Sequence, residues 1–257
     1  MSALLELHGC SVFFGGLRAV SALDLSVGQG DLLGLIGPNG AGKTTVFNAI
    51  TGVCRLDAGR ILFRGSRIDR LPTHRIARLG IVRTFQNIRL FPQLSVLDNV
   101  RAARHEHADY PLWWALTRIP AFAQAEQERT EEALEALAFF SIAHLADKRA
   151  GALAYADQRR VEMARALAMR PVLLLLDEPT AGMNPVESAE IMDRIRRARE
   201  ERGLSVLLIE HDMRVVMGTC PRIAVLDHGE KIAEGPPEQV RQDPRVIEAY
   251  LGEEVPV

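Results

Sequence analysis

The chain has 257 residues, a length that suits one large α/β domain, and its 47% apolar and 25% charged residues are ordinary for a globular protein. Lys and Arg total 31 against 33 Asp and Glu, for a net charge of −2. This balance argues against a dedicated nucleic-acid binder, which normally carries a basic excess. No stretch approaches the ~20 apolar residues of a membrane-spanning helix, and the N-terminus lacks a secretory signal pattern. We therefore expect a cytosolic protein that reaches a membrane only through a partner.

The three cysteines, Cys10, Cys54 and Cys220, are far apart and lack the spacing of metal ligands. An odd and sparse cysteine count is typical of proteins in reducing compartments. We expect these residues to be buried thiols.

The first third of the chain predicts short strands and one short helix. Apolar and polar residues alternate over 23–27, which indicates a half-buried strand, and 32–36 is a continuous apolar strand. A Gly-rich loop follows, and then a helix from about Lys43 to Gly52. Apolar residues at 61–63 and 68 flank a tight turn.

The middle of the chain, about 88–168, has a helical character. Four apolar residues recur at helical spacing with acidic residues between them: Ala133, Leu134, Leu137 and Phe140. Trp113 and Trp114 lie between two prolines. We favour packing within a surface insertion for this pair, and a partner-binding patch is the alternative.

Strands and helices alternate again in the last third. The apolar run 172–176 predicts a strand covered on both faces, as in a parallel sheet. Asn184, Pro185 and Glu187 form a helix start, and this helix should end at Gly203. A strand at 206–209 and a hairpin at 222–233 follow. The pattern predicts an α/β fold with a mostly parallel sheet.

Residues 37–44 read GPNGAGKT, after an apolar strand and at the start of a helix, which is the arrangement of a phosphate-binding loop. The glycines let successive N–H groups face one anion, and the helix N-terminus adds a partial positive charge. Lys43 would contact the β- and γ-phosphates, and the Thr44 hydroxyl would bind Mg²⁺. A Gly-rich turn followed by a chance Lys-Thr is the plain alternative. The residues expected to bind the phosphates here are Asn39, Gly40, Ala41, Gly42, Lys43, Thr44 and Thr45.

Asp177 and Glu178 follow the apolar run 172–176, at the edge where open α/β sheets bind ligands. Adjacent strand residues point in opposite directions, so these two acids should have different roles. We expect Asp177 to hold the metal through water and Glu178 to act as general base on the attacking water. Without the phosphate loop, a strand end capped by acids would be the better interpretation.

These motifs, in this order along almost the whole chain, resemble the ABC transporter ATPase family. The resemblance implies a P-loop NTPase core with an N-terminal antiparallel β subdomain and a helical subdomain, about 88–168, inserted within a RecA-like core. Residues 1–257 would form a single ABC ATPase domain. The resemblance further implies that Phe14 stacks on adenine, with Val20 in the same pocket. Gln86 would join the metal shell and sense the membrane subunit, and His211 would contact the γ-phosphate. Phe14 could instead be a core residue.

The finer resemblance is to the larger ATP-binding subunit of branched-chain amino-acid importers. It is carried by the segments 84–91, 153–160, 209–213 and 249–252. This resemblance implies membrane permease subunits, a second ATPase subunit and a periplasmic or extracellular binding protein as partners. The chain would then lie on the cytoplasmic side of the plasma membrane as a peripheral subunit. Importers of urea or short amides share much of the pattern.

One segment departs from the family. The signature, Leu-Ser-Gly-Gly-Gln in the family, is replaced here by Leu153, Ala154, Tyr155, Ala156 and Asp157. Ala154 lacks the hydroxyl that would bind the partner's γ-phosphate, and the Cβ of Ala156 restricts φ and occupies space. We hypothesise two unequal ATP sites in a heterodimer, with a harmless local variation as the alternative and a homodimer also possible.

Two other functions fit parts of the sequence. A homodimeric ATPase for lipid or polysaccharide export would keep the fold and change the task. A nucleotide-gated interaction protein with little turnover would explain the altered signature, but Lys43, Glu178 and His211 argue against it.

Overall fold

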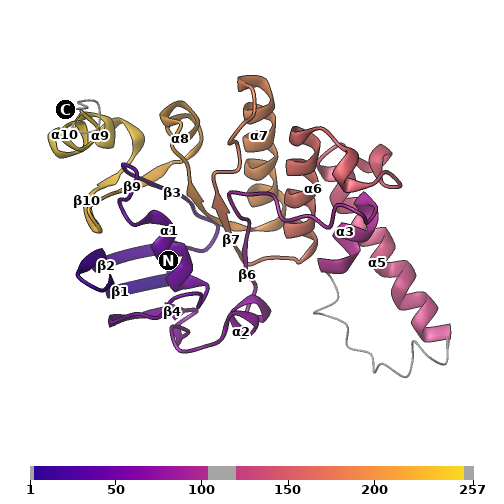
Figure 1. Ribbon diagram of the computed structural model, residues 1–257, viewed down its shortest axis with the longest axis horizontal. Helices are drawn as coiled ribbons and strands as arrows, with labels where there is room; N and C mark the ends of the chain where they lie inside the picture. Colours follow the sequence, from indigo (N-terminus) through magenta and orange to yellow (C-terminus); the bar gives the residue numbers. More distant parts are fainter. Residues whose placement is uncertain (1–2, 104–119, 252–257) are drawn as a thin grey trace. The chain divides into compact units, whose positions relative to one another are not determined.

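The computed structural model of the chain describes residues 3–103 and 120–251 (Figure 1). Trp113 and Trp114, and thus the two interpretations of this pair, lie outside the described residues. The chain forms two compact units. The sheet unit contains Met1–Arg83, Val172–Pro179 and Ile195–Val257, and the helical unit contains Thr84–Pro171 and Thr180–Arg194.

The larger sheet of the sheet unit has six strands in the order β10-β9-β3-β8-β7-β6 (Figure 1). Every neighbouring pair is parallel except β9 and β10. All residues of β3, β7 and β8 are buried, as a parallel sheet covered on both faces requires. The strands are β3 (Leu32–Ile36), β6 (Ile81–Arg83), β7 (Leu173–Asp177), β8 (Ser205–Ile209), β9 (Arg222–Asp227) and β10 (Glu230–Gly235).

The smaller sheet is antiparallel, with the order β2-β1-β4-β5. Its strands are β1 (Ala3–Phe14), β2 (Leu17–Gly28), β4 (Ala58–Phe63) and β5 (Ser66–Arg67). On β2, Leu23, Leu25 and Val27 are buried while Asp24 and Ser26 are exposed, so the predicted alternation is confirmed. The predicted fold class, a mostly parallel core with an antiparallel β subdomain and helices, is confirmed as well.

Helix α1 (Lys43–Ile50) follows the Gly-rich loop and packs into the core of the sheet unit. Phe47 and Ile50 are fully buried, in one apolar cluster with Leu5 of the smaller sheet and Leu35 of the larger sheet. This burial fixes the orientation of α1 and therefore of the loop before it. The other helices of this unit are α2 (Thr73–Arg78), α8 (Met213–Thr219), α9 (Pro237–Gln242) and α10 (Pro244–Leu251).

Helix α7 (Pro185–Arg202) begins and ends where the sequence predicts. The Asn184 side chain accepts hydrogen bonds from the N–H groups of Val186 (2.9 Å) and Glu187 (3.0 Å). Glu187 in return accepts from the Asn184 N–H at 3.0 Å, which completes a reciprocal cap. After the helix, Gly203 takes a φ of +64°, the usual conformation of a glycine that ends a helix.

The helical unit contains α3 (Val96–Ala103), α5 (Pro120–Phe139), α6 (Tyr155–Ala168) and the first part of α7, with short 3₁₀ turns at Ala143–Leu145 and Ala150–Ala152. Of the four apolar residues predicted on one helical face, three are buried: Ala133, Leu137 and Phe140. Leu134 is 37% exposed, so its predicted burial is wrong. It lies one residue, or about 100° around the helix, away from the face that Ala133 and Leu137 share.

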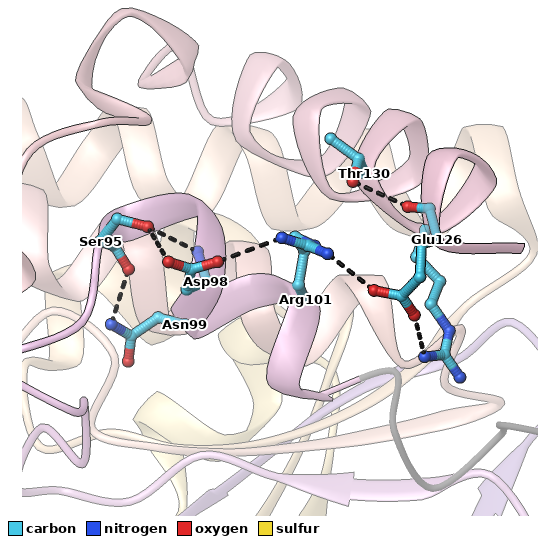
Figure 2. A network of polar contacts seen from close by, with 7 residues as sticks. Ser95, Asp98, Asn99, Arg101, Glu126 and Thr130 are labelled. Carbon is cyan, nitrogen blue, oxygen red and sulfur yellow. Dashed lines mark hydrogen bonds and ion pairs between the residues drawn. The ribbon is translucent and has the colours of Figure 1, made fainter. Parts of the chain in front are cut away.

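A polar network joins α3 to α5 (Figure 2). The Ser95 hydroxyl caps α3 by accepting from the Asp98 N–H at 2.9 Å. Arg101 then pairs with Asp98 at 3.2 Å and with Glu126 of α5 at 2.8 Å. Because Asn99 is fully buried and bonds to both the N–H and the carbonyl of Phe91, the same helix also fixes the segment before it. These hydrogen bonds attach the Phe91 segment to α3.

All three cysteines are free thiols. Cys10 and Cys220 are buried, as expected, and burial raises the pKa of their thiols to about 11 and about 12. Cys54 is only partly buried, which differs from the expectation. In the described part of the chain, no helix is both long and apolar enough to cross a membrane.

Candidate functional site

At several positions of the Gly-rich loop between β3 and α1, the backbone has a conformation that only glycine adopts without strain. Gly37, Gly40 and Gly42 have φ values of +148°, +77° and +100°. A Cβ on Gly42 would lie 2.2 Å from the Ala19 carbonyl oxygen, and one on Gly37 would lie 2.0 Å from that of Leu226. The loop is therefore pressed against the backbone of two neighbouring segments, and its curled shape depends on glycine.

Lys43 and Thr44 open α1 directly after this loop. The Lys43 ammonium lies 2.6 Å from the Gly37 carbonyl oxygen and 2.7 Å from that of Pro38, so it extends back over the loop. Thr44 is exposed, as are Asn39 and Gly40, while Ala41 is buried and Thr45 is partly buried. An anion in the curl of the loop would meet backbone N–H groups, the helix N-terminus and one full positive charge.

Asp177 ends β7 and is 4% exposed. Its Oδ2 lies 2.7 Å from Nη2 of Arg83, the last residue of the neighbouring strand β6. Arg83 also donates from Nη1 to Oδ1 of Asn48 on α1 at 2.7 Å. One guanidinium thus links the strand that carries the predicted metal ligand to the helix that follows the phosphate loop.

Glu178 comes directly after β7 and has a φ of +48°, which is strained for a residue other than glycine. Its N–H donates to the Ile209 carbonyl at 2.9 Å, which fixes the backbone in this turn. Oε2 of Glu178 lies 3.6 Å from Nδ1 of His211, and the two side chains are 20% and 62% exposed. The structure therefore brings Glu178 and His211 together, and the turn separates Glu178 from the buried Asp177.

Phe14 and Val20 lie on the hairpin of β1 and β2. Phe14 is 54% exposed, whereas Val20 is 1% exposed and belongs to the apolar core. The Val20 side chain lies 3.5 Å from the position that a Cβ on Gly42 would take. The exposed Phe14 ring is available for stacking, and the Val20 side chain supports the phosphate loop from within the core.

In the helical unit, Gln86 lies on an exposed bend that follows Thr84. The guanidinium of Arg159, which is fully buried on α6, donates to the carbonyls of Phe85 at 2.8 Å and Gln86 at 2.9 Å. Glu162, one turn further along α6, pairs with Arg159 at 2.7 Å. Two buried charges on α6 therefore hold the backbone of the segment that presents Gln86.

The signature-like segment forms the N-terminus of α6. Ala154 is the residue before the helix, with φ −61° and ψ 154°, and its side chain makes no capping hydrogen bond. Tyr155 is 45% exposed, and Ala156 and Asp157 lie in the first turn. Because residue 156 is helical, a Cβ there places no unfavourable restriction on φ, so that part of the sequence argument is wrong. The Cβ of Ala156 still occupies space at the helix N-terminus, where the partner's γ-phosphate is expected to approach, so that part of the argument stays a prediction.

The residues of the phosphate loop and the end of β7 fit a nucleoside triphosphate with Mg²⁺. The loop has the backbone cradle and ammonium group for phosphates, and Thr44 and Asp177 offer the hard oxygen ligands that Mg²⁺ prefers. Among the described residues there is no cluster of three or more His, Cys, Asp or Glu side chains able to hold a metal ion. Thr44 and Asp177 suit Mg²⁺ held by few protein ligands together with substrate phosphates.

The sequence argument missed Arg83 and gave Arg159 no role. An arginine at a strand end has no spacing that marks it as buried. Besides Glu162, the acceptors of Arg159 are the backbone carbonyls of Phe85 and Gln86, and any residue supplies such a carbonyl. The one available signal was position: Arg83 comes three residues before Gln86.

Residues 20–181, more than half of the chain, match the family described as ABC transporter. Residues 230–256 match a second family, described as branched-chain amino acid ATP-binding cassette transporter. The two matches lie in different parts of the chain and point to the same class of protein.

Three curated relatives extend over nearly the whole chain. The high-affinity branched-chain amino acid transport ATP-binding protein BraF of Pseudomonas aeruginosa is 45% identical over 250 residues, which cover 97% of this chain and 98% of BraF. The corresponding protein LivG of Escherichia coli strain K12 is 44% identical with the same coverage. The lipopolysaccharide export system ATP-binding protein LptB of Haemophilus influenzae is 38% identical and covers 92% of each chain.

Solved structures of ATP-binding cassettes have the same fold. The ADP conformation of the cassette MJ1267 has a TM-score of 0.85 and 32% identity, over 98% of this chain and 100% of that chain. The dimeric cassette MJ0796 bound to ADP and Pi has a TM-score of 0.76 and 25% identity, over 90% of this chain and 98% of that chain. The phosphate loop, the two acids at the end of β7 and these matches agree: the chain belongs to the ABC transporter family of ATP-binding cassettes.

Proposed function

We propose that this chain is the ATP-hydrolysing subunit of an importer of branched-chain amino acids. The observation that carries the proposal is the 44–45% identity to BraF and LivG over nearly the full length, and the match of residues 230–256 agrees with it. The two units would together form one ABC ATPase domain, residues 1–257.

In the proposed mechanism, the backbone of the phosphate loop and Lys43 bind the β- and γ-phosphates. Thr44 and Asp177 would hold Mg²⁺, which would supply positive charge to neutralise the phosphate oxygens. Glu178 orients and polarises the attacking water, and His211, 3.6 Å from Glu178, helps to fix that carboxylate and contacts the γ-phosphate. Phe14 stacks on the adenine from the exposed end of β1. Most of the catalytic effect is electrostatic positioning, without a covalent intermediate.

The base assignment predicts the behaviour of Glu178→Gln. The amide cannot accept the proton of the attacking water, so ATP turnover should fall by about 100- to 10,000-fold. ATP affinity should stay within about threefold, because Glu178 is not expected to bind the phosphates. Turnover is measured in the reconstituted transporter and affinity by equilibrium binding to the purified chain. Glu200→Gln, an exposed acid of α7, is the matched control. Normal turnover in Glu178→Gln would overturn the assignment.

The partners follow from the same proposal. We propose two membrane permease subunits, a second and different ATPase subunit, and a periplasmic or extracellular binding protein. The chain would be peripheral, on the cytoplasmic side of the membrane. Gln86 and the exposed Phe91 would contact the permease. Asn99 and Arg159 bind the backbone of these two segments and would hold them in place for that contact.

The similarity to LptB keeps lipopolysaccharide export as a second candidate function. The match of residues 230–256 favours amino-acid import over export. Purification of the intact complex through this chain separates the two candidates. Recovery of a binding protein that binds leucine, isoleucine or valine is the expected result. A complex without a binding protein, and with lipid-stimulated ATP turnover, would contradict the import proposal.

A further inference from the structure

Arg83 is a buried cation at the junction of three elements of the sheet unit. Its side chain is only 7% exposed, and its guanidinium carbon lies 5.4 Å from the centre of the Phe47 ring on α1. Nη2 bonds to Asp177 Oδ2 on β7 and Nη1 bonds to Asn48 Oδ1 on α1, each at 2.7 Å. The planar guanidinium is thus fixed by a ring face and by two directed hydrogen bonds.

This geometry determines how the Asp177 carboxylate is presented. An aspartate side chain that is only 6% exposed needs a nearby positive charge or hydrogen-bond donors, and Arg83 supplies both. Because Asn48 and the Phe47 ring hold the guanidinium, the bond to Oδ2 also limits rotation of the carboxylate. Arg83 therefore sets the position of Asp177, a predicted metal ligand, relative to α1, whose first turn carries Thr44, another predicted ligand.

We propose that Arg83 is a positioning residue for Mg²⁺-dependent nucleotide binding, acting by holding Asp177 in register with the start of α1. The inference rests on the proposed function, because it assumes that Asp177 and Thr44 serve a nucleotide-bound Mg²⁺. Partners of this kind, which hold a metal ligand without touching the metal, typically change metal affinity by about 10- to 100-fold when substituted.

Arg83→Lys separates positioning from charge. Lysine keeps the positive charge beside Asp177, but its single ammonium cannot reproduce the two diverging bonds to Asn48 and Asp177. The purified full-length chain is titrated with ATP in the presence of excess Mg²⁺ and again in EDTA. We expect the ATP affinity in EDTA to stay within about twofold of wild type. The factor by which Mg²⁺ increases the ATP affinity should be about tenfold smaller than in wild type. Substitution of Mn²⁺ for Mg²⁺ allows the metal itself to be followed by electron paramagnetic resonance.

Two further variants make the test decisive. Arg67→Lys alters another arginine of the sheet unit that pairs with an aspartate, Asp69, at 3.0 Å, and should behave as wild type. Asn48→Ala removes one support of the guanidinium and should reduce the Mg²⁺ effect about threefold. If Arg83→Lys does not fold, as judged by circular dichroism, Asn48→Ala decides the question, and an unchanged Mg²⁺ effect in it overturns the proposal.

The outcomes for the two proposals are distinct. A wild-type chain that does not bind ATP would contradict the proposed function itself. A wild-type chain with a normal Mg²⁺ effect, and an Arg83→Lys chain with the same effect, would overturn only the role of Arg83. Equal loss of ATP affinity with and without Mg²⁺ would also overturn it, because it would indicate a purely structural role.

Discussion

Helices α1 and α6 both begin at segments that the family resemblance assigns to phosphate groups, but the two helix starts are constructed differently. The residue before α1 is Gly42, with φ +100°, and a Cβ on it would lie 2.2 Å from the Ala19 carbonyl oxygen. The residue before α6 is Ala154, with an ordinary extended backbone at φ −61°. The first start depends on backbone that only glycine adopts easily, and the second does not.

The surroundings of the two helix starts differ in the same way. The phosphate loop is shaped by backbone packing against Ala19 and Leu226. Around α6, the neighbouring segment that carries Gln86 is held by buried side chains, Arg159 and Glu162. We infer that an added methyl group destabilises the phosphate loop, whereas the loss of a buried charge destabilises the region around α6. Three substitutions test this difference.

The largest expected effect is that of Arg159→Met in the helical unit. Arg159 is fully buried, and its loss leaves the buried Glu162 carboxylate without its charged partner. Removal of one member of a buried pair costs about 3–5 kcal/mol in the free energy of unfolding. Urea denaturation of the purified chain measures this loss.

The control for this prediction is Arg160→Met, one residue further along α6. Arg160 also forms two ion pairs, with Asp157 and Glu190, but its side chain is 21% exposed. Its loss should cost about 1 kcal/mol or less. The double variant Arg159→Met with Glu162→Leu should recover much of the stability, because no unpaired charge stays buried. Equal losses for Arg159→Met and Arg160→Met would show that burial of the pair does not matter.

A smaller effect on stability is expected for Gly42→Ala in the phosphate loop. The new Cβ would meet the Ala19 oxygen at 2.2 Å in a backbone that already disfavours alanine, so we expect a cost of about 3 kcal/mol. ATP binding should be lost as the loop opens. Gly203→Ala is the control: its φ is +64°, but nothing lies within 4 Å of the added Cβ, so only about 1 kcal/mol is expected. Similar costs for both glycines would exclude close backbone approach as the cause.

The difference between the two helix starts also explains which features could be predicted from the sequence and which could not. The strand 32–36, the helix start at Asn184 and the phosphate loop were predictable because each depends on residue types at a fixed spacing. Arg83 and Arg159 were not, because Arg83 binds an aspartate across the sheet and Arg159 binds the backbone carbonyls of a segment far away in sequence. The ion pair of Arg159 with Glu162 has ordinary helical spacing, which does not by itself mark the pair as buried. The helical position of Ala156 was missed because the signature was compared with a glycine-containing family pattern, and not with its own helix propensity.

The smallest effect is expected for Ala156→Gly at the start of α6. Glycine is a poorer helix former, so the isolated chain should lose up to about 1 kcal/mol. In the assembled transporter, removal of the Cβ gives the partner subunit's nucleotide more space at the helix N-terminus, and we expect ATP turnover to rise by less than about tenfold, a change of under about 1.4 kcal/mol. Ala138→Gly, an exposed position of α5, should cost similar stability without changing turnover. Unchanged turnover in Ala156→Gly would mean that the start of α6 binds phosphate equally well without glycine, and that the two ATP sites need not differ.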